Sequence, residues 1–241
     1  MNAFETRLLK LAVAPYSSAG KFASHFAKGK LGGDPVFKEI LMRGLIQSED
    51  HILDIGCGQG LLSSWLLAAE SMASRSDWPN HWSPAPLAVS VLGIELMPAD
   101  IQRAELALNK HQERFAFTQG DMCTTAFAKA DVAVILDVLH YVPYAAQEDV
   151  LLRLKDALSP NGLLILRIGD ADGGIGFKIS NWVDAIVTLV RGHSLSRLYC
   201  RPLKEWETIL TNIGFVIDAK PMSKGTPFAN VLLTARLIQP T

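Results

Sequence analysis

The sequence lacks the cysteine pattern of a metal-binding or disulfide-rich protein. It has three cysteines, Cys57, Cys123 and Cys200, which are far apart, and it contains no Cys-x-x-Cys pair. An odd and dispersed set of thiols argues against a disulfide framework and against a zinc or redox site. We therefore expect reduced cysteines, no bound metal and a cytoplasmic protein.

Long apolar runs and concentrated positive charge are also missing. The apolar patch from Leu8 to Ala14 is interrupted by Lys10 and is too short to cross a bilayer. Glu5 and Arg7 precede it, unlike the basic start of a secretory signal. The 23 basic and 24 acidic side chains nearly balance, so the charge pattern of a general nucleic-acid-binding protein is absent. These absences predict a soluble protein without a membrane span and without stable nucleic-acid binding.

From about residue 50 the chain alternates short apolar runs with helical stretches. The apolar runs are His51–Ile55, Ala88–Leu96, Phe115–Gln119, Val132–Leu136 and Leu163–Ile168. The helical stretches are Leu61–Glu70, Ala99–Gln112 and Ala145–Leu158. Continuous apolar strands separated by helices are typical of a parallel sheet covered on both faces. Because such crossovers are right-handed, we predict a doubly wound α/β fold.

The C-terminal end has a different pattern. Two strand-like runs, Phe215–Ala219 and Ala229–Leu237, are joined by a connection too short for a helix, which implies an antiparallel pair. The predicted fold is therefore a mostly parallel, seven-stranded sheet that ends in an antiparallel hairpin. An ordinary dinucleotide-binding domain does not end in this way.

Three segments fall outside this scaffold. Residues 1–48 are predicted to be helical and to form a lid or substrate segment ahead of the main domain, 49–241. Residues 71–87 are rich in Ser, Pro and Trp and are predicted to form an inserted loop. Residues 169–200 are predicted to form a substrate-side insertion with a helix at Phe177–Val190. Its apolar stripe could cover a substrate or simply pack in the core.

A glycine-rich loop, Asp54-Ile-Gly-Cys-Gly-Gln-Gly60, joins the first strand to a helix. Glycines let the chain turn sharply and let a ligand approach the backbone. The dinucleotide fingerprint G-x-G-x-x-G would need a glycine where Leu61 stands. This spacing disfavours a nicotinamide-dependent oxidoreductase. Asp54 precedes the first glycine by two positions, where a carboxylate can help to position a cationic amine.

The loop resembles the first motif, Asp-x-Gly-x-Gly-x-Gly, of the class I methyltransferases. The resemblance extends from about residue 50 to the C-terminus. It implies that S-adenosylmethionine is the cofactor and S-adenosylhomocysteine the product. It also implies that Asp54, Gly56, Cys57 and Gly58 bind the cofactor.

The ends of the next three strands agree with this family. By resemblance, Glu95 accepts the ribose hydroxyls, with Leu96 beside it, and Asp121 accepts the adenine amino group while the Met122 backbone N–H faces the ring. Asp137 would lie beside the methionine part of the cofactor. Each acidic residue alone could equally cap a turn or lie in solvent. Together they follow successive strands, at the edge where open α/β sheets bind ligands.

The chemistry of methyl transfer points to His140 as a general base or substrate-orienting residue, because imidazole titrates near neutral pH. A structural histidine before Pro143 is the alternative. Tyr141 is a candidate substrate contact, although packing is a common use of tyrosine.

Other candidate substrate contacts are Arg167 and Tyr16. Arg167 ends an otherwise apolar strand, where a charge is costly unless it is paired. Asp170 and Asp172 are its expected partners, and recognition of a substrate carboxylate is the alternative. Tyr16 lies in the predicted lid with His25 and Lys30, which could face the pocket or belong to an ordinary surface helix–loop–helix.

The acceptor is expected to be a small molecule. Enzymes that methylate nucleobase amines usually carry Asn/Asp-Pro-Pro-Tyr/Phe where this chain has Asp137-Val-Leu-His140. A weaker resemblance to bacterial enzymes of acyl or aryl-polyene pathways suggests a phenolic, quinone-like or acyl acceptor, free or attached to a carrier protein. The alternatives are a catalytically silent cofactor-binding partner and an RNA or protein methyltransferase.

Overall fold

The computed structural model describes residues 1–171, 198–222 and 229–237. It divides the chain into two compact units, Met1–Val132 and Ala133–Thr241. The seven strands have the order β3-β2-β1-β4-β5-β7-β6, which confirms the predicted sheet. The predicted helix at Phe177–Val190 lies outside the described residues. No helix in the described ranges is long and apolar enough to cross a membrane.

The first unit begins with four short helical elements, as the sequence predicts for residues 1–48. They are α1 (Ala3–Val13), the 3-10 helix η1 (Ala14–Ser17), α2 (Lys21–Gly33) and α3 (Pro35–Met42). Asn2 and Glu5 form a reciprocal capping box at the start of α1. Asp34 is the N-cap of α3, and its side chain accepts a hydrogen bond from Val36 N at 3.1 Å. Pro35 occupies the first helical position, where no N–H donor is needed. These caps satisfy helix-terminal N–H groups that would otherwise lack partners.

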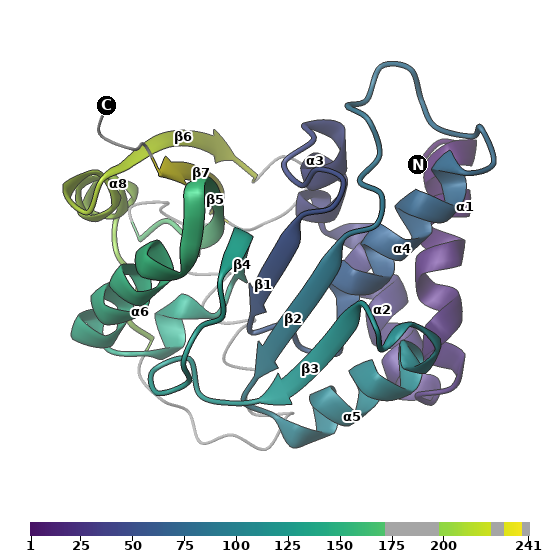
Figure 1. Ribbon diagram of the computed structural model, residues 1–241, viewed down its shortest axis with the longest axis horizontal. Coiled ribbons are helices and arrows are strands. Elements are labelled where there is room, and N and C mark those ends of the chain that lie inside the picture. The colour runs from purple at the N-terminus through teal and green to yellow at the C-terminus, as the bar shows by residue number, and fades with distance from the viewer. Residues whose placement is uncertain (172–197, 223–228, 238–241) are drawn as a thin grey trace. The chain divides into compact units, whose positions relative to one another are not determined.

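Three parallel strands form the sheet of the first unit. They are β1 (His51–Ile55), β2 (Ser90–Glu95) and β3 (Phe115–Gln119), which lie side by side in Figure 1. Their register pairs Leu53 with Leu92 and Leu92 with Ala116. Because the strands are parallel, the glycine loop after β1, Glu95 at the end of β2 and Gly120 after β3 meet at one edge.

The helices of this unit differ slightly from the predicted ranges. α4 (Leu61–Ala73) extends into the predicted loop, since Met72 continues its buried face. α5 (Pro98–Ala107) is shorter than expected and is followed by the 3-10 helix η2 (Asn109–His111). The loop after α4 packs its rings on α1, with Trp78 and Trp82 edge-on to Phe4 at centroid distances of 5.7 and 5.2 Å.

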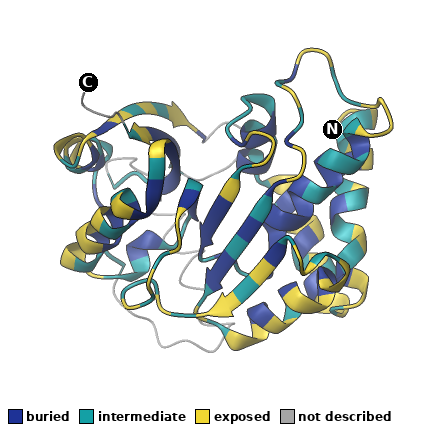
Figure 2. Cartoon of the chain, viewed as in Figure 1, coloured by how far each residue is buried: buried dark blue, intermediate teal, exposed yellow. Residues whose placement is uncertain are grey.

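The second unit contains the predicted antiparallel hairpin. β4 (Ala130–Leu136) leads into η3 (Leu139–Tyr141), α6 (Tyr144–Ala157) and β5 (Leu158–Gly169), and then come α8 (Leu203–Asn212), β6 (Phe215–Pro221) and β7 (Asn230–Leu237). β7 is antiparallel to both β5 and β6. Figure 2 shows β6 with many exposed positions, as expected for an edge strand, whereas most of β7 is buried.

Candidate functional site

The glycine loop depends on left-handed backbone at alternate positions. Gly56, Gly58 and Gly60 have φ angles of +73°, +54° and +76°, a region that side chains disfavour. A close approach constrains the neighbouring strand as well, because a Cβ on Gly93 would lie 2.7 Å from the Sγ of Cys57. The spacing G-x-G-x-G therefore follows from the backbone of this loop.

Strand β2 holds the first half of the loop. The N–H groups of Gly56 and Cys57 donate to the carbonyl of Ile94 at 2.8 and 3.2 Å. Gly58 N donates to Glu95 Oε2 at 2.9 Å, and Met97 N donates to Glu95 Oε1 at 3.0 Å. A carboxylate offers about four acceptor positions, so Glu95 keeps capacity for the hydroxyl groups of a ligand.

Asp54 is a buried carboxylate beside this loop. It is 4% exposed, and its side-chain carboxylate makes no hydrogen bond or ion pair with any residue that the structure describes. Burial, and then the negative charge of Glu95, raise the pKa of Asp54 to about 7. A buried carboxylate of this kind is stabilised by a cationic or N–H-donating partner. Its surroundings therefore fit the ammonium-bearing end of S-adenosylmethionine.

The residues after β3 lie at the same edge. Gly120 N donates to the Glu95 carbonyl at 3.0 Å, which ties the end of β3 to the end of β2. Asp121 is exposed, and its Oδ1 accepts a hydrogen bond from Cys123 N at 2.8 Å. Met122 is half-buried and Leu96 is 54% exposed. The alternative use of Asp121 as a turn cap is thus observed, and its carboxylate remains open to solvent.

The predicted lid residues have three different environments. Tyr16 is fully buried, and its hydroxyl donates to the carbonyl of Gln59 in the glycine loop at 3.0 Å. His25 is exposed. Lys30 forms an ion pair with Asp34 at 2.8 Å. The hydroxyl of Tyr16 therefore contacts the glycine loop of the protein itself.

In the second unit, the buried Arg167 forms an ion pair with the partly exposed Asp137. Arg167 Nε donates to Asp137 Oδ1 at 2.7 Å, and a second contact joins Arg167 Nη2 to Asp137 Oδ2. Asp137 has a φ angle of +59°, uncommon for a residue with a side chain. Asp137 is thus a partner of Arg167 that the sequence did not predict. Of the predicted partners, Asp170 accepts a hydrogen bond from Leu203 N at 3.1 Å, and Asp172 lies outside the described residues. The carboxylate of Asp137 supplies the negative charge that the buried guanidinium of Arg167 requires.

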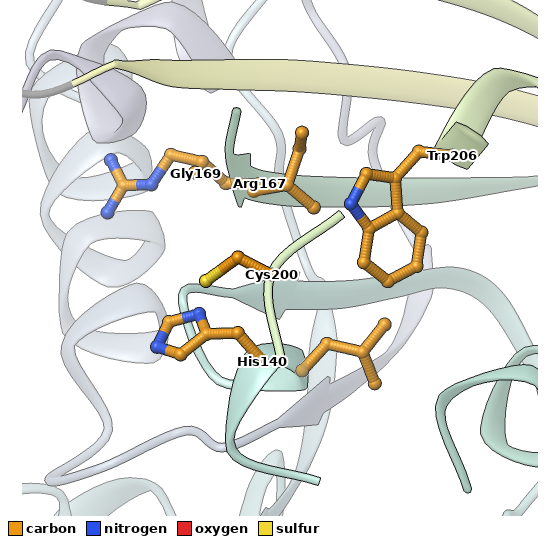
Figure 3. A pocket seen from close by; sticks show the side chains of 7 residues that line it. His140, Arg167, Gly169, Cys200 and Trp206 are labelled. Carbon is orange, nitrogen blue, oxygen red and sulfur yellow. The ribbon is translucent and has the colours of Figure 1, made fainter. Parts of the chain in front are cut away.

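A small pocket of this unit contains His140. Arg167 from β5, Trp206 from α8, Gly169 and Cys200 also line the pocket. Figure 3 labels these residues together with His140. His140 is 9% exposed, and burial lowers the pKa of its imidazole despite the opposing charge of Asp137. The imidazole is therefore neutral at neutral pH. The ring of Tyr141 is tilted against it at a centroid distance of 4.3 Å.

The sequence did not identify the buried polar groups Arg201 and Gln147. Arg201 is 5% exposed and donates to Gln147 Oε1 at 2.9 Å and to Glu148 Oε1 at 2.7 Å. Gln147 in turn donates to the carbonyl of Tyr199 at 2.7 Å. A polar residue on the same helical face as Val150 was the available signal for Gln147.

Comparisons with known proteins relate part of the chain to methyltransferases. Residues 53–164 match the family model of a methyltransferase domain. Carboxy-S-adenosyl-L-methionine synthase of Marinobacter nauticus is 28% identical over 130 residues, or 53% of this chain and 46% of that protein. The chain thus matches about half the length of its curated relatives.

Solved structures share the fold. An O-methyltransferase family protein from Burkholderia thailandensis has a TM-score of 0.65 at 14% identity, covering 90% of this chain and 60% of that one. Magnesium protoporphyrin IX methyltransferase from Synechocystis with bound S-adenosylhomocysteine has a TM-score of 0.58 at 18% identity, covering 90% and 88%. These structures share the predicted fold, and the methyltransferase family model matches residues 53–164 of the chain.

Proposed function

Because a methyltransferase domain spans residues 53–164, we propose that the protein transfers a methyl group from S-adenosylmethionine to a small-molecule acceptor. The environment of Asp54 is the main support for this proposal. Asp54 is a buried carboxylate without a partner in the described residues, beside a second acidic group and a loop of left-handed glycines. A cofactor with a positively charged amine supplies the charge that this site lacks.

In this proposal, the residues at each strand end bind a different part of the cofactor. The loop backbone at Gly56, Cys57 and Gly58 allows close approach, and Glu95 accepts the ribose hydroxyls. Asp121 accepts the adenine amino group, with Leu96 and the backbone of Met122 beside the ring, and Asp137 belongs to the methionine end. The cofactor brings an activated methyl group, so the protein has mainly to bind, align and exclude water.

His140 is the proposed general base. A neutral imidazole can take the proton of a phenolic or similar acceptor, and Tyr141 provides an adjoining ring for that acceptor. Arg167 and Tyr16 have their polar groups engaged by Asp137 and Gln59. We therefore assign them positioning roles in place of direct substrate contact. The proposed acceptors are phenolic, quinone-like or acyl compounds, free or attached to a carrier protein, in the cytoplasm.

A second function follows from the names of the curated relatives. They are carboxy-S-adenosyl-L-methionine synthases, so the chain could modify S-adenosylmethionine itself instead of methylating an acceptor. A catalytically silent cofactor-binding protein and an RNA or protein methyltransferase are further alternatives. The chemical product distinguishes these functions.

The test is a product analysis with methyl-labelled S-adenosylmethionine. The purified protein is incubated with panels of phenolic, quinone and acyl compounds, and with RNA and protein, and the products are identified by mass spectrometry. We expect S-adenosylhomocysteine together with a labelled small molecule. A carboxylated cofactor would support the second function, and a labelled macromolecule would contradict the choice of acceptor.

A further inference from the structure

Two hydrogen bonds join the N-terminal segment to the glycine loop at Gln59. The hydroxyl of Tyr16, in η1, donates to the Gln59 carbonyl at 3.0 Å. The side-chain Nε2 of Gln59 donates back to the carbonyl of Ala23, in α2, at 2.9 Å. Tyr16 is 0% exposed and Gln59 is 1% exposed. Both hydrogen bonds are thus shielded from water, where the loss of either partner is costly.

These two bonds complete the support of the loop. Strand β2 holds the first half through Ile94 and Glu95, which accept from Gly56, Cys57 and Gly58. On the other side, Tyr16 and Gln59 join the second half to η1 and α2. The left-handed glycines can adopt many other conformations, so external contacts must select the one that is observed.

We propose that Tyr16 and Gln59 are cofactor-positioning residues, and that η1 and α2 form part of the support of the cofactor site. This inference rests on the proposed function, because it assumes that the loop binds S-adenosylmethionine. Without the Tyr16 hydroxyl, the Gln59 carbonyl loses its buried partner and the loop can take other conformations. Part of the binding free energy must then be spent on ordering the glycine loop, so the affinity for the cofactor falls.

The test compares affinities for S-adenosylhomocysteine by isothermal titration calorimetry. Tyr16→Phe removes one hydroxyl and keeps the ring. Since a hydrogen bond contributes about as much as a severalfold change in affinity, we expect roughly fivefold to tenfold weaker binding. Gln59→Met keeps the length of the side chain and removes its bond to Ala23, so it should weaken binding in the same direction.

Trp65→Phe is the matched control. It deletes another buried hydrogen bond between the N-terminal helices and α4, from Trp65 Nε1 to the Phe37 carbonyl at 2.8 Å, and this bond does not involve the glycine loop. The control should lower the melting temperature while it keeps the wild-type affinity. A stability loss alone therefore does not mimic the expected result.

The double variant Tyr16→Phe/Gln59→Met gives a further criterion. Because both bonds meet at Gln59, the two losses of affinity should not add. If Tyr16→Phe fails to fold, Gln59→Met is judged by the same affinity criterion. Wild-type affinity in the folded variants would overturn the positioning role and leave the proposed function intact. A wild-type protein that does not bind S-adenosylhomocysteine would overturn both.

Discussion

At the scale of single residues, we expect Asp54 to couple the proposed cofactor binding to proton release. Its pKa is raised to about 7 by burial and by Glu95, and a cationic ligand favours the ionised form. We therefore expect the affinity for S-adenosylhomocysteine to rise with pH up to about 7 and to level off above it. Calorimetry over this range should show the slope, and Asp54→Asn should reduce both the affinity and the slope.

The same residue should oppose stability in the ligand-free protein. Its folded-state pKa lies above its ordinary value of 3.8, so the folded state is favoured while Asp54 is protonated, and this contribution is lost as pH rises from that value to about 7. Above this range Asp54→Asn should melt several degrees higher than the ligand-free wild type. An Asn variant that is less stable at about pH 8 would argue that Asp54 is already compensated.

His140 should act on turnover and not on cofactor binding. Once an acceptor is found, His140→Gln should lower kcat by about 10²-fold or more while the affinity for S-adenosylhomocysteine stays within twofold, roughly. Because burial lowers the pKa of His140, the acidic limb of the wild-type kcat profile should lie below about 6.5. Equal losses of affinity and turnover would indicate a structural histidine.

At the scale of elements, strands were easier to predict than their contacts. β1 and β3 have the predicted bounds, because short apolar runs between turn residues specify buried strands. α8 was not predicted, since it buries only Trp206 and Leu210. The pairing of Arg167 with Asp137 joins residues 30 positions apart and depends on how β4 and β5 come together. Local sequence patterns carry no such information.

The Asp137–Arg167 pair should matter for stability more than its position at a strand end suggests. Arg167→Met leaves Asp137 without its buried partner and should cost about 3 kcal/mol of unfolding free energy. In urea unfolding, the double variant Arg167→Met/Asp137→Asn should recover part of that loss, because it removes the charge of Asp137 as well. A single variant as stable as the wild type would contradict the pairing.

At the scale of the whole molecule, the proposed cofactor residues are unevenly distributed. Asp54, Glu95, Asp121 and the Tyr16–Gln59 contact all belong to the unit Met1–Val132. The meeting of the acidic residues at one edge could be predicted, because parallel strands bring their carboxyl ends together. The support from η1 could not, because it arises from tertiary contacts between distant segments, such as Tyr16 with Gln59.

Ligand binding should therefore protect this unit first. At about 100 times its Kd, a ligand adds about 2.7 kcal/mol to the stability of what it binds. Hydrogen exchange should slow around the glycine loop, the end of β2 and η1 when S-adenosylhomocysteine is added. Uniform protection of the whole chain, or protection confined to the second unit, would place the ligand elsewhere.

The central claim is that the loop after β1 binds S-adenosylmethionine and not a dinucleotide. Calorimetric titration of the protein at about pH 8 with S-adenosylhomocysteine, and separately with NAD, tests it most directly. We expect saturable binding of S-adenosylhomocysteine, weakened about tenfold or more in a folded Glu95→Ala variant, and no binding of NAD. Tight binding of NAD without any response to S-adenosylhomocysteine would contradict the account.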